Sequence, residues 1–183
     1  DTSVKVPLIV SQPGFVQAGV CCHEMVSQYD YLSTLLEYCG IENPLTGQDS
    51  PGKSFLPLLK GLPAKGHDSL VVYDEYGPCR MVRTSEWKYI HRYNMDKDEL
   101  YHLCEDPNED INLIGEAGTE AITAELKGTL ADWFARYTDP VFDGSVQPVK
   151  GNGQINAIDN LKPGELAFDQ NRQCTTNPIA DPS

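Results

Sequence analysis

The chain has 183 residues, which is enough for one domain with a core of its own. Its formal net charge of −13 argues against nucleic acid and anionic lipid as partners, because both require clusters of Lys and Arg. No run reaches the ~18 consecutive apolar residues of a membrane helix, so we also expect no membrane partner.

The first sixty residues are predicted to hold one strand and one helix. Residues 4–10 form an apolar run typical of a buried strand. Residues 23–39 change to helical spacing, with Gly40 placed to cap the end of the helix. A short helical turn is expected at 54–60. The apolar stripe of the longer helix is expected to comprise Met25, Tyr29, Leu32, Leu36 and Cys39.

Four short β-type runs follow, separated by turn-forming residues: the first is hydrophobic, and the second and third alternate polar and apolar residues. Alternation with a period of two predicts an antiparallel meander with one buried face. A helix is predicted at 119–137, and it should pack on that face. The strands are expected at 70–74, 80–84, 87–93 and 99–103, and the apolar face of the helix at Ile122, Leu126, Leu130, Trp133 and Tyr137.

The predicted fold class is therefore α+β, a four-stranded antiparallel sheet with a packed C-terminal helix. We divide the chain into a strand-and-helix region at 1–60, the sheet-and-helix subdomain at 61–138 and an irregular tail at 139–183. The tail is rich in Gly, Pro, Asn and Asp and has no sustained period.

Several segments, in this order, carry a resemblance to a known family. They are Asp30-Tyr31-Leu32-Ser33-Thr34-Leu35-Leu36, Gly52-Lys53-Ser54-Phe55-Leu56-Pro57-Leu58-Leu59, Arg80-Met81-Val82-Arg83-Thr84, Trp87-Lys88-Tyr89-Ile90, Glu99-Leu100-Tyr101-His102-Leu103 and Asp106-Pro107. Together they resemble the C-terminal portion of the sulfatase family, within the alkaline-phosphatase-like superfamily. The tail looks like that of bacterial members.

The resemblance implies a two-part parent enzyme that hydrolyses a sulfated carbohydrate. The large α/β part would carry a Cys or Ser oxidised to formylglycine, whose hydrate attacks sulfur, and a divalent metal, usually calcium. The small part would be an antiparallel sheet with a helix that helps to shape the substrate pocket. This chain would then be the small part plus a strand and helix left over from a truncated core. Its partners would be the N-terminal catalytic region of the same protein and a sulfated sugar, and a periplasmic or secreted location is favoured for the parent.

The chain itself is predicted to lack catalytic and metal-binding residues, so we expect the fragment to be inactive. Cys79 and Arg83 have the spacing of the formylglycine motif, but Met81 replaces its proline. The four histidines are scattered, and the clustered Asp106, Glu109 and Asp110 are typical of a solvated turn. We therefore expect no cofactor in this chain.

Three residues are candidates for substrate binding. Glu75 ends the first predicted strand, where the resemblance implies a carboxylate that binds sugar hydroxyls or an amine. The fork of donors on Arg80 could hold an anionic sugar. His91 lies at the far end of the third strand. The alternative for each residue is a surface or strand-pairing role.

Two other functions remain open. One is a phosphodiesterase or phosphonate hydrolase of the same superfamily, and the other is a non-catalytic carbohydrate-binding or interaction module. A domain separated from its core would expose apolar surface, so we also expect dimers or larger species.

Overall fold

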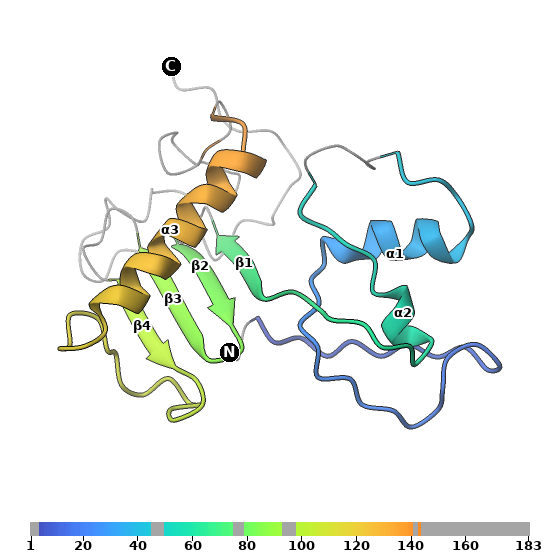
Figure 1. Cartoon of the computed structure of the whole chain (residues 1–183), viewed down its shortest axis with the longest axis horizontal. Coiled ribbons are helices and arrows are strands. Elements are labelled where there is room, and N and C mark those ends of the chain that lie inside the picture. Colours follow the sequence, from blue (N-terminus) through green and yellow to red (C-terminus); the bar gives the residue numbers. More distant parts are fainter. Residues whose placement is uncertain (1–3, 45–49, 75–78, 93–97, 141–142, 144–183) are drawn as a thin grey trace, which may run out of the picture. The chain divides into compact units, whose positions relative to one another are not determined.

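A computed structural model describes residues 4–44, 50–74, 79–92, 98–140 and 143 of the chain (Figure 1). Four strands form one sheet in the order β1-β2-β3-β4, so each strand pairs with its neighbour in sequence. This is the predicted meander, and the α+β fold class is confirmed. The elements are α1 (Asp30–Tyr38), α2 (Leu56–Leu59), β1 (Ser69–Asp74), β2 (Cys79–Thr84), β3 (Trp87–Arg92), β4 (Glu99–His102) and α3 (Glu120–Tyr137).

The β2–β3 hairpin shows how local chemistry sets the strand ends. The Thr84 hydroxyl accepts hydrogen bonds from the backbone N–H groups of Trp87, at 2.9 Å, and Glu86, at 3.3 Å. This satisfies donors that a two-residue turn would otherwise leave open. The predicted connection at 85–86 is therefore confirmed.

Helix α3 lies across one face of the sheet (Figure 1). Leu126, Leu130 and Phe134 are its buried residues. The ring of Tyr73 on β1 meets the ring of Phe134 edge-on, with centroids 5.4 Å apart. The predicted helix is confirmed, but Phe134 replaces Trp133 in the buried row, because the spacing 126, 130, 134 follows the helical period.

The prediction of one buried sheet face is wrong for the central strands. Met81 and Val82 are neighbours on β2 and both are buried, as are Tyr89 and Ile90 on β3. Neighbouring residues of a strand point to opposite faces, so both faces of these strands are covered.

The expected N-terminal strand at 4–10 is not formed, and these residues adopt an irregular path. Ile9 is 89% exposed. An apolar run becomes a strand only when a neighbouring strand accepts its backbone hydrogen bonds. The strands of the described chain begin only at Ser69.

Helix α1 begins at Asp30, seven residues later than predicted, and its predicted apolar stripe is wrong. The buried residues are Asp30, Ser33 and Thr34, whereas Leu32 and Cys39 are exposed. The reason is hydrogen bonding. Thr34 Oγ1 donates to the Asp30 carbonyl at 2.8 Å and accepts the N–H of Phe55 at 3.0 Å, which turns the polar face of the helix inward. The cap at Gly40, with φ of 67°, is confirmed, and so is the short helix α2.

The chain divides into two compact units. The first unit comprises Asp1–Leu70, Arg83–Trp87 and His102–Ile111, and the second comprises Val71–Val82, Lys88–Tyr101 and Asn112–Ser183. The predicted boundaries at residues 60 and 138 stay a prediction. No helix of the described residues is both long and apolar enough to cross a membrane.

Candidate functional site

The meander brings two of the predicted site residues to the same end of the sheet. The two-residue turn pairs Thr84 with Trp87, so residues 80 and 91 also lie opposite each other on β2 and β3. Arg80 and His91 therefore lie at the same end of the sheet and on the same face. Glu75 follows directly after β1, which ends at this end of the sheet, but Glu75 itself lies outside the described residues.

Arg80 is held inside the second unit. Its side chain is 9% exposed, and its guanidinium carbon lies 3.7 Å from the centre of the Phe134 ring on α3. Its Nη2 also donates to Asp143 Oδ1. A guanidinium that stacks on an aromatic ring and pairs with a carboxylate stabilises the packing of α3 on β2. Its predicted contact with substrate stays a prediction.

His91 belongs to a polar cluster centred on Asp98, which we call the Asp98 cluster. Its members are Tyr89, His91, Asp98 and Lys127. The Asp98 carboxylate accepts hydrogen bonds from Tyr89 Oη at 2.5 Å, from His91 Nδ1 at 2.9 Å and from Lys127 Nζ, on α3, at 3.1 Å. One carboxylate thus connects β3, the start of β4 and α3.

The Asp98 cluster favours the ionised form of the Asp98 carboxyl group. Burial alone would raise the pKa of Asp98, but the hydrogen bonds from Tyr89, His91 and Lys127 outweigh it and lower the pKa to about 2. Burial, together with the hydrogen bond to Asp98, raises the pKa of Tyr89. Tyr89 is therefore a fixed donor and Asp98 a fixed anion at neutral pH, which holds the His91 ring in one orientation.

The thiol of Cys79 is a poor nucleophile in this position. Cys79 is the first residue of β2, and burial raises its pKa. The thiolate is the reactive form of cysteine, so a raised pKa lowers reactivity at neutral pH.

The acidic turn at 105–110 is organised by its own backbone. Asp106 accepts the N–H groups of Asp110 at 3.0 Å and Ile111 at 2.9 Å, and these hydrogen bonds lower the pKa of Asp106. Glu109 adopts a left-handed conformation there, with φ of 62°. Among the described residues, no three His, Cys, Asp or Glu side chains gather as a metal site would need.

Sequence reasoning missed a buried carboxylate in the first unit. Asp30 is 1% exposed and accepts the backbone N–H groups of Ser27 at 2.7 Å and Lys53 at 2.8 Å. His67 Nε2 lies 2.8 Å and 2.9 Å from its two carboxylate oxygens. Asp30 therefore joins the start of α1 to two later loops. The usable signal was an acidic residue at the start of a helix, three positions after a serine.

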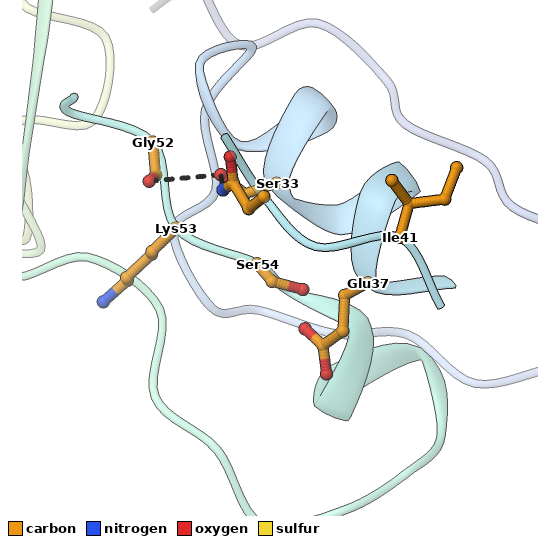
Figure 2. A pocket seen from close by; sticks show the side chains of 7 residues that line it. Ser33, Glu37, Ile41, Gly52, Lys53 and Ser54 are labelled. Atoms are coloured by element: carbon orange, nitrogen blue, oxygen red, sulfur yellow. Dashed lines mark hydrogen bonds between the residues drawn. The ribbon is translucent and has the colours of Figure 1, made fainter. Parts of the chain in front are cut away.

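A shallow pocket lies beside α1, with a volume of about 340 Å³ (Figure 2). Asn43 Nδ2 donates to Ser33 Oγ at 3.2 Å within it. Figure 2 shows the Lys53 side chain directed away from Glu37, and its Nζ donates to the carbonyl of Gly66 at 2.5 Å. The ammonium of Lys53 is thus engaged by a backbone carbonyl of the same unit. The lining residues are Ser33, Glu37, Ile41, Asn43, Gly52, Lys53 and Ser54.

Comparison with known proteins gives a consistent result. The family model described as "N-sulphoglucosamine sulphohydrolase, C-terminal" matches residues 1–136. The chain is 32% identical over 148 residues to the Delta 4,5-hexuronate-2-O-sulfatase of Bacteroides thetaiotaomicron, covering 76% of this chain and 30% of that protein. It is 30% identical over 146 residues to the N-acetylglucosamine-6-O-sulfatase of the same organism, covering 74% of this chain and 26% of that one.

A solved structure of a protein in complex with its substrate D-glucosamine-2-N,6-O-disulfate is also similar. The TM-score is 0.52 at 28% identity, and the match covers 64% of this chain and 25% of that one. The chain therefore spans about a third or less of the length of these relatives.

Proposed function

Because the chain belongs to the family of N-sulphoglucosamine sulphohydrolase C-terminal domains, we propose that it is the C-terminal domain of a sulfatase that removes sulfate from a carbohydrate. The family match over residues 1–136 carries this proposal. The names of the relatives support the substrate class, since one is a hexuronate sulfatase and another an N-acetylglucosamine sulfatase.

We assign the chemical step to the part of such a protein that this chain does not span. Sulfatases generally use formylglycine, which supplies the nucleophile, and calcium, which stabilises the negative charge of the sulfate. The described residues do not fit either group, because they offer no cluster of metal ligands and because Met81 replaces the proline of the formylglycine motif. We derive no catalytic step from them.

The proposed task of this domain is to line the substrate pocket with one end of its sheet. Two connections between strands lie at that end, one after β1 and one after β3. Glu75 belongs to the first, and the second is flanked by His91 and by Asp98, which orients the His91 ring. The His91 side chain is 44% exposed, so a sugar can reach it. We propose Glu75 and His91 as contacts to sugar hydroxyl groups, with Arg80 fixing helix α3 behind them.

Substitution at position 91 tests this assignment in the full-length gene product. We expect His91→Ala to lower kcat/KM for a sulfated disaccharide about tenfold, as loss of one polar substrate contact typically does. The control is His23→Ala, an exposed histidine in an irregular segment. Equal kcat/KM values for His91→Ala and the wild type would exclude the contact.

The proposed activity is tested by comparing the isolated chain with the full-length gene product. The substrates are 4-nitrophenyl sulfate, sulfated disaccharides and a 4-nitrophenyl phosphonate ester, with and without calcium. We expect the full-length protein to hydrolyse sulfate esters and the isolated chain to hydrolyse none of the three. Turnover by the isolated chain, or a full-length protein that prefers the phosphonate, would overturn the proposal. A periplasmic or secreted location stays a prediction, which a signal peptide encoded in the gene would support.

A further inference from the structure

The two oxygens of the Asp98 carboxylate have different partners. Oδ2 accepts the Tyr89 hydroxyl at 2.5 Å and lies 3.1 Å from Lys127 Nζ, whereas Oδ1 lies 2.9 Å from Nδ1 of His91. The backbone of Asp98 is also fixed, because its carbonyl oxygen accepts a hydrogen bond from Asn112 Nδ2 at 3.1 Å. The carboxylate is therefore held in place with one oxygen directed at the His91 ring.

This contact decides which ring nitrogen of His91 carries the proton. A neutral imidazole has one N–H donor and one nitrogen acceptor, and the hydrogen bond made by one nitrogen fixes the role of the other. The lowered pKa of Asp98, about 2, leaves its carboxylate ionised at neutral pH, and an ionised carboxylate only accepts hydrogen bonds. Nδ1 must therefore donate to Asp98, which leaves Nε2 of the neutral ring as a hydrogen-bond acceptor.

The charged groups around His91 balance one another in pairs. Lys127 on α3 pairs with Asp98, and Arg80, which lies opposite His91 on β2, pairs with Asp143. The His91 side chain is 44% exposed. Among the described residues, a ligand at this ring therefore meets the polarity of Nε2 rather than an unbalanced charge.

An acceptor at Nε2 of His91 discriminates between the groups that a sulfated sugar carries. A hydroxyl or amino group donates a hydrogen bond to this nitrogen, whereas the oxygens of a sulfate ester only accept and would face its lone pair. Placing one acceptor against another selects against the wrong ligand without any change in the contacts to the right one.

We propose that Asp98 is a positioning residue that fixes Nε2 of His91 as an acceptor, so that this domain selects a sugar with a free hydroxyl or amino group at that position and disfavours one with a sulfate there. This inference rests on the proposed function, because it requires His91 to contact the sugar. It adds to that function a selection between singly and more highly sulfated substrates.

The tautomer of His91 is measured without any substrate, by two-bond proton–nitrogen NMR correlations in the isotope-labelled chain at pH 8. The His91 signals are those that disappear in His91→Gln. We expect the wild type to carry the proton on Nδ1. In Asp98→Asn we expect it on Nε2, because Tyr89 and Lys127 hold the amide oxygen at the position of Oδ2, so that the amide nitrogen donates to Nδ1.

The matched control is Tyr89→Phe, which removes a different hydrogen bond to Asp98 but keeps the carboxylate. Its tautomer should equal that of the wild type, whereas a merely structural role of Asp98 would make the two variants behave alike. A proton on Nε2 in the wild type, or one that stays on Nδ1 in Asp98→Asn, would overturn the inference. The wild-type spectrum decides even where a variant does not fold.

The selection itself is measured in the full-length gene product, with disaccharides that share one scissile sulfate ester and differ by one further sulfate. At pH 8 we expect one such added sulfate to lower kcat/KM at least about tenfold in the wild type and in Tyr89→Phe, but less than about threefold in Asp98→Asn. Equal ratios in Asp98→Asn and the wild type would overturn the inference. A protein that hydrolyses none of the disaccharides would refute the proposed function, and their Kd values from calorimetry would then report the selection directly.

Discussion

The substitution Asp98→Asn tests whether the Asp98 cluster holds the sheet and α3 together. Asp98 has an ordinary pKa of 3.8 and a pKa of about 2 in the folded chain, and its side chain is 18% exposed. At 1.36 kcal/mol per pH unit, this difference corresponds to about 2 kcal/mol of folding free energy at pH 7. Asparagine keeps the shape but removes the charge that His91, Tyr89 and Lys127 hydrogen-bond.

The pH dependence gives this prediction its sign. A carboxylate with a lowered folded-state pKa stabilises the fold above its unfolded pKa, and the stabilisation disappears as the pH falls through the folded pKa. The gap between the wild type and Asp98→Asn should therefore be about 2 kcal/mol at pH 7, roughly half of that at pH 3, and close to zero below pH 2.

The assay is urea unfolding followed by tryptophan fluorescence, since Trp133 lies on α3, the helix that carries Lys127. The control is Asp132→Asn, which changes the net charge equally at an exposed position of the same helix. We expect the control to shift the free energy of unfolding by less than about 0.5 kcal/mol. Equal stability of Asp98→Asn and the wild type at pH 7, or a gap that widens on acidification, would refute the reasoning.

Four further substitutions test other packing contacts by urea unfolding at pH 7. A Cβ at Gly52 would lie 1.9 Å from the carbonyl oxygen of Tyr29, so Gly52→Ala should destabilise by roughly 3 kcal/mol, whereas Gly128→Ala, with open space around it, should stabilise by up to ~1 kcal/mol. Arg80→Lys loses the planar stack on an aromatic ring and should cost about 1–2 kcal/mol. Asp30→Ala leaves two backbone N–H groups without their acceptor and should cost roughly 3 kcal/mol or more. Wild-type stability in any of the three destabilising variants would show that its contact is not formed in solution.

Local sequence signals were sufficient for the sheet and α3. The first two strands are separated by Gly and Pro and the last two by Asn and Asp, and the turn at 85–86 is set by the neighbouring Thr84. Helix α1 was misjudged because hydrophobic periodicity assumes that apolar residues point inward. In α1 the inner face is polar, and Asp30 and Thr34 bond to a segment some twenty residues away.

The candidate site was predicted only in part, for the same reason. Arg80 and His91 could be named from their places in predicted strands. Asp98 could not, because its environment is made by Lys127, 29 residues later on another element, and by Tyr89 across the hairpin. A single sequence does not show such long-range pairing.

We propose that this chain is one domain of a sulfatase whose chemistry takes place in another region. The decisive experiment measures sulfate release from a sulfated disaccharide by this chain alone and by the same chain joined to the region that precedes it in its gene. We predict release only by the joined protein. Release by the chain alone, or none from the joined protein with any sulfate ester, would contradict the account.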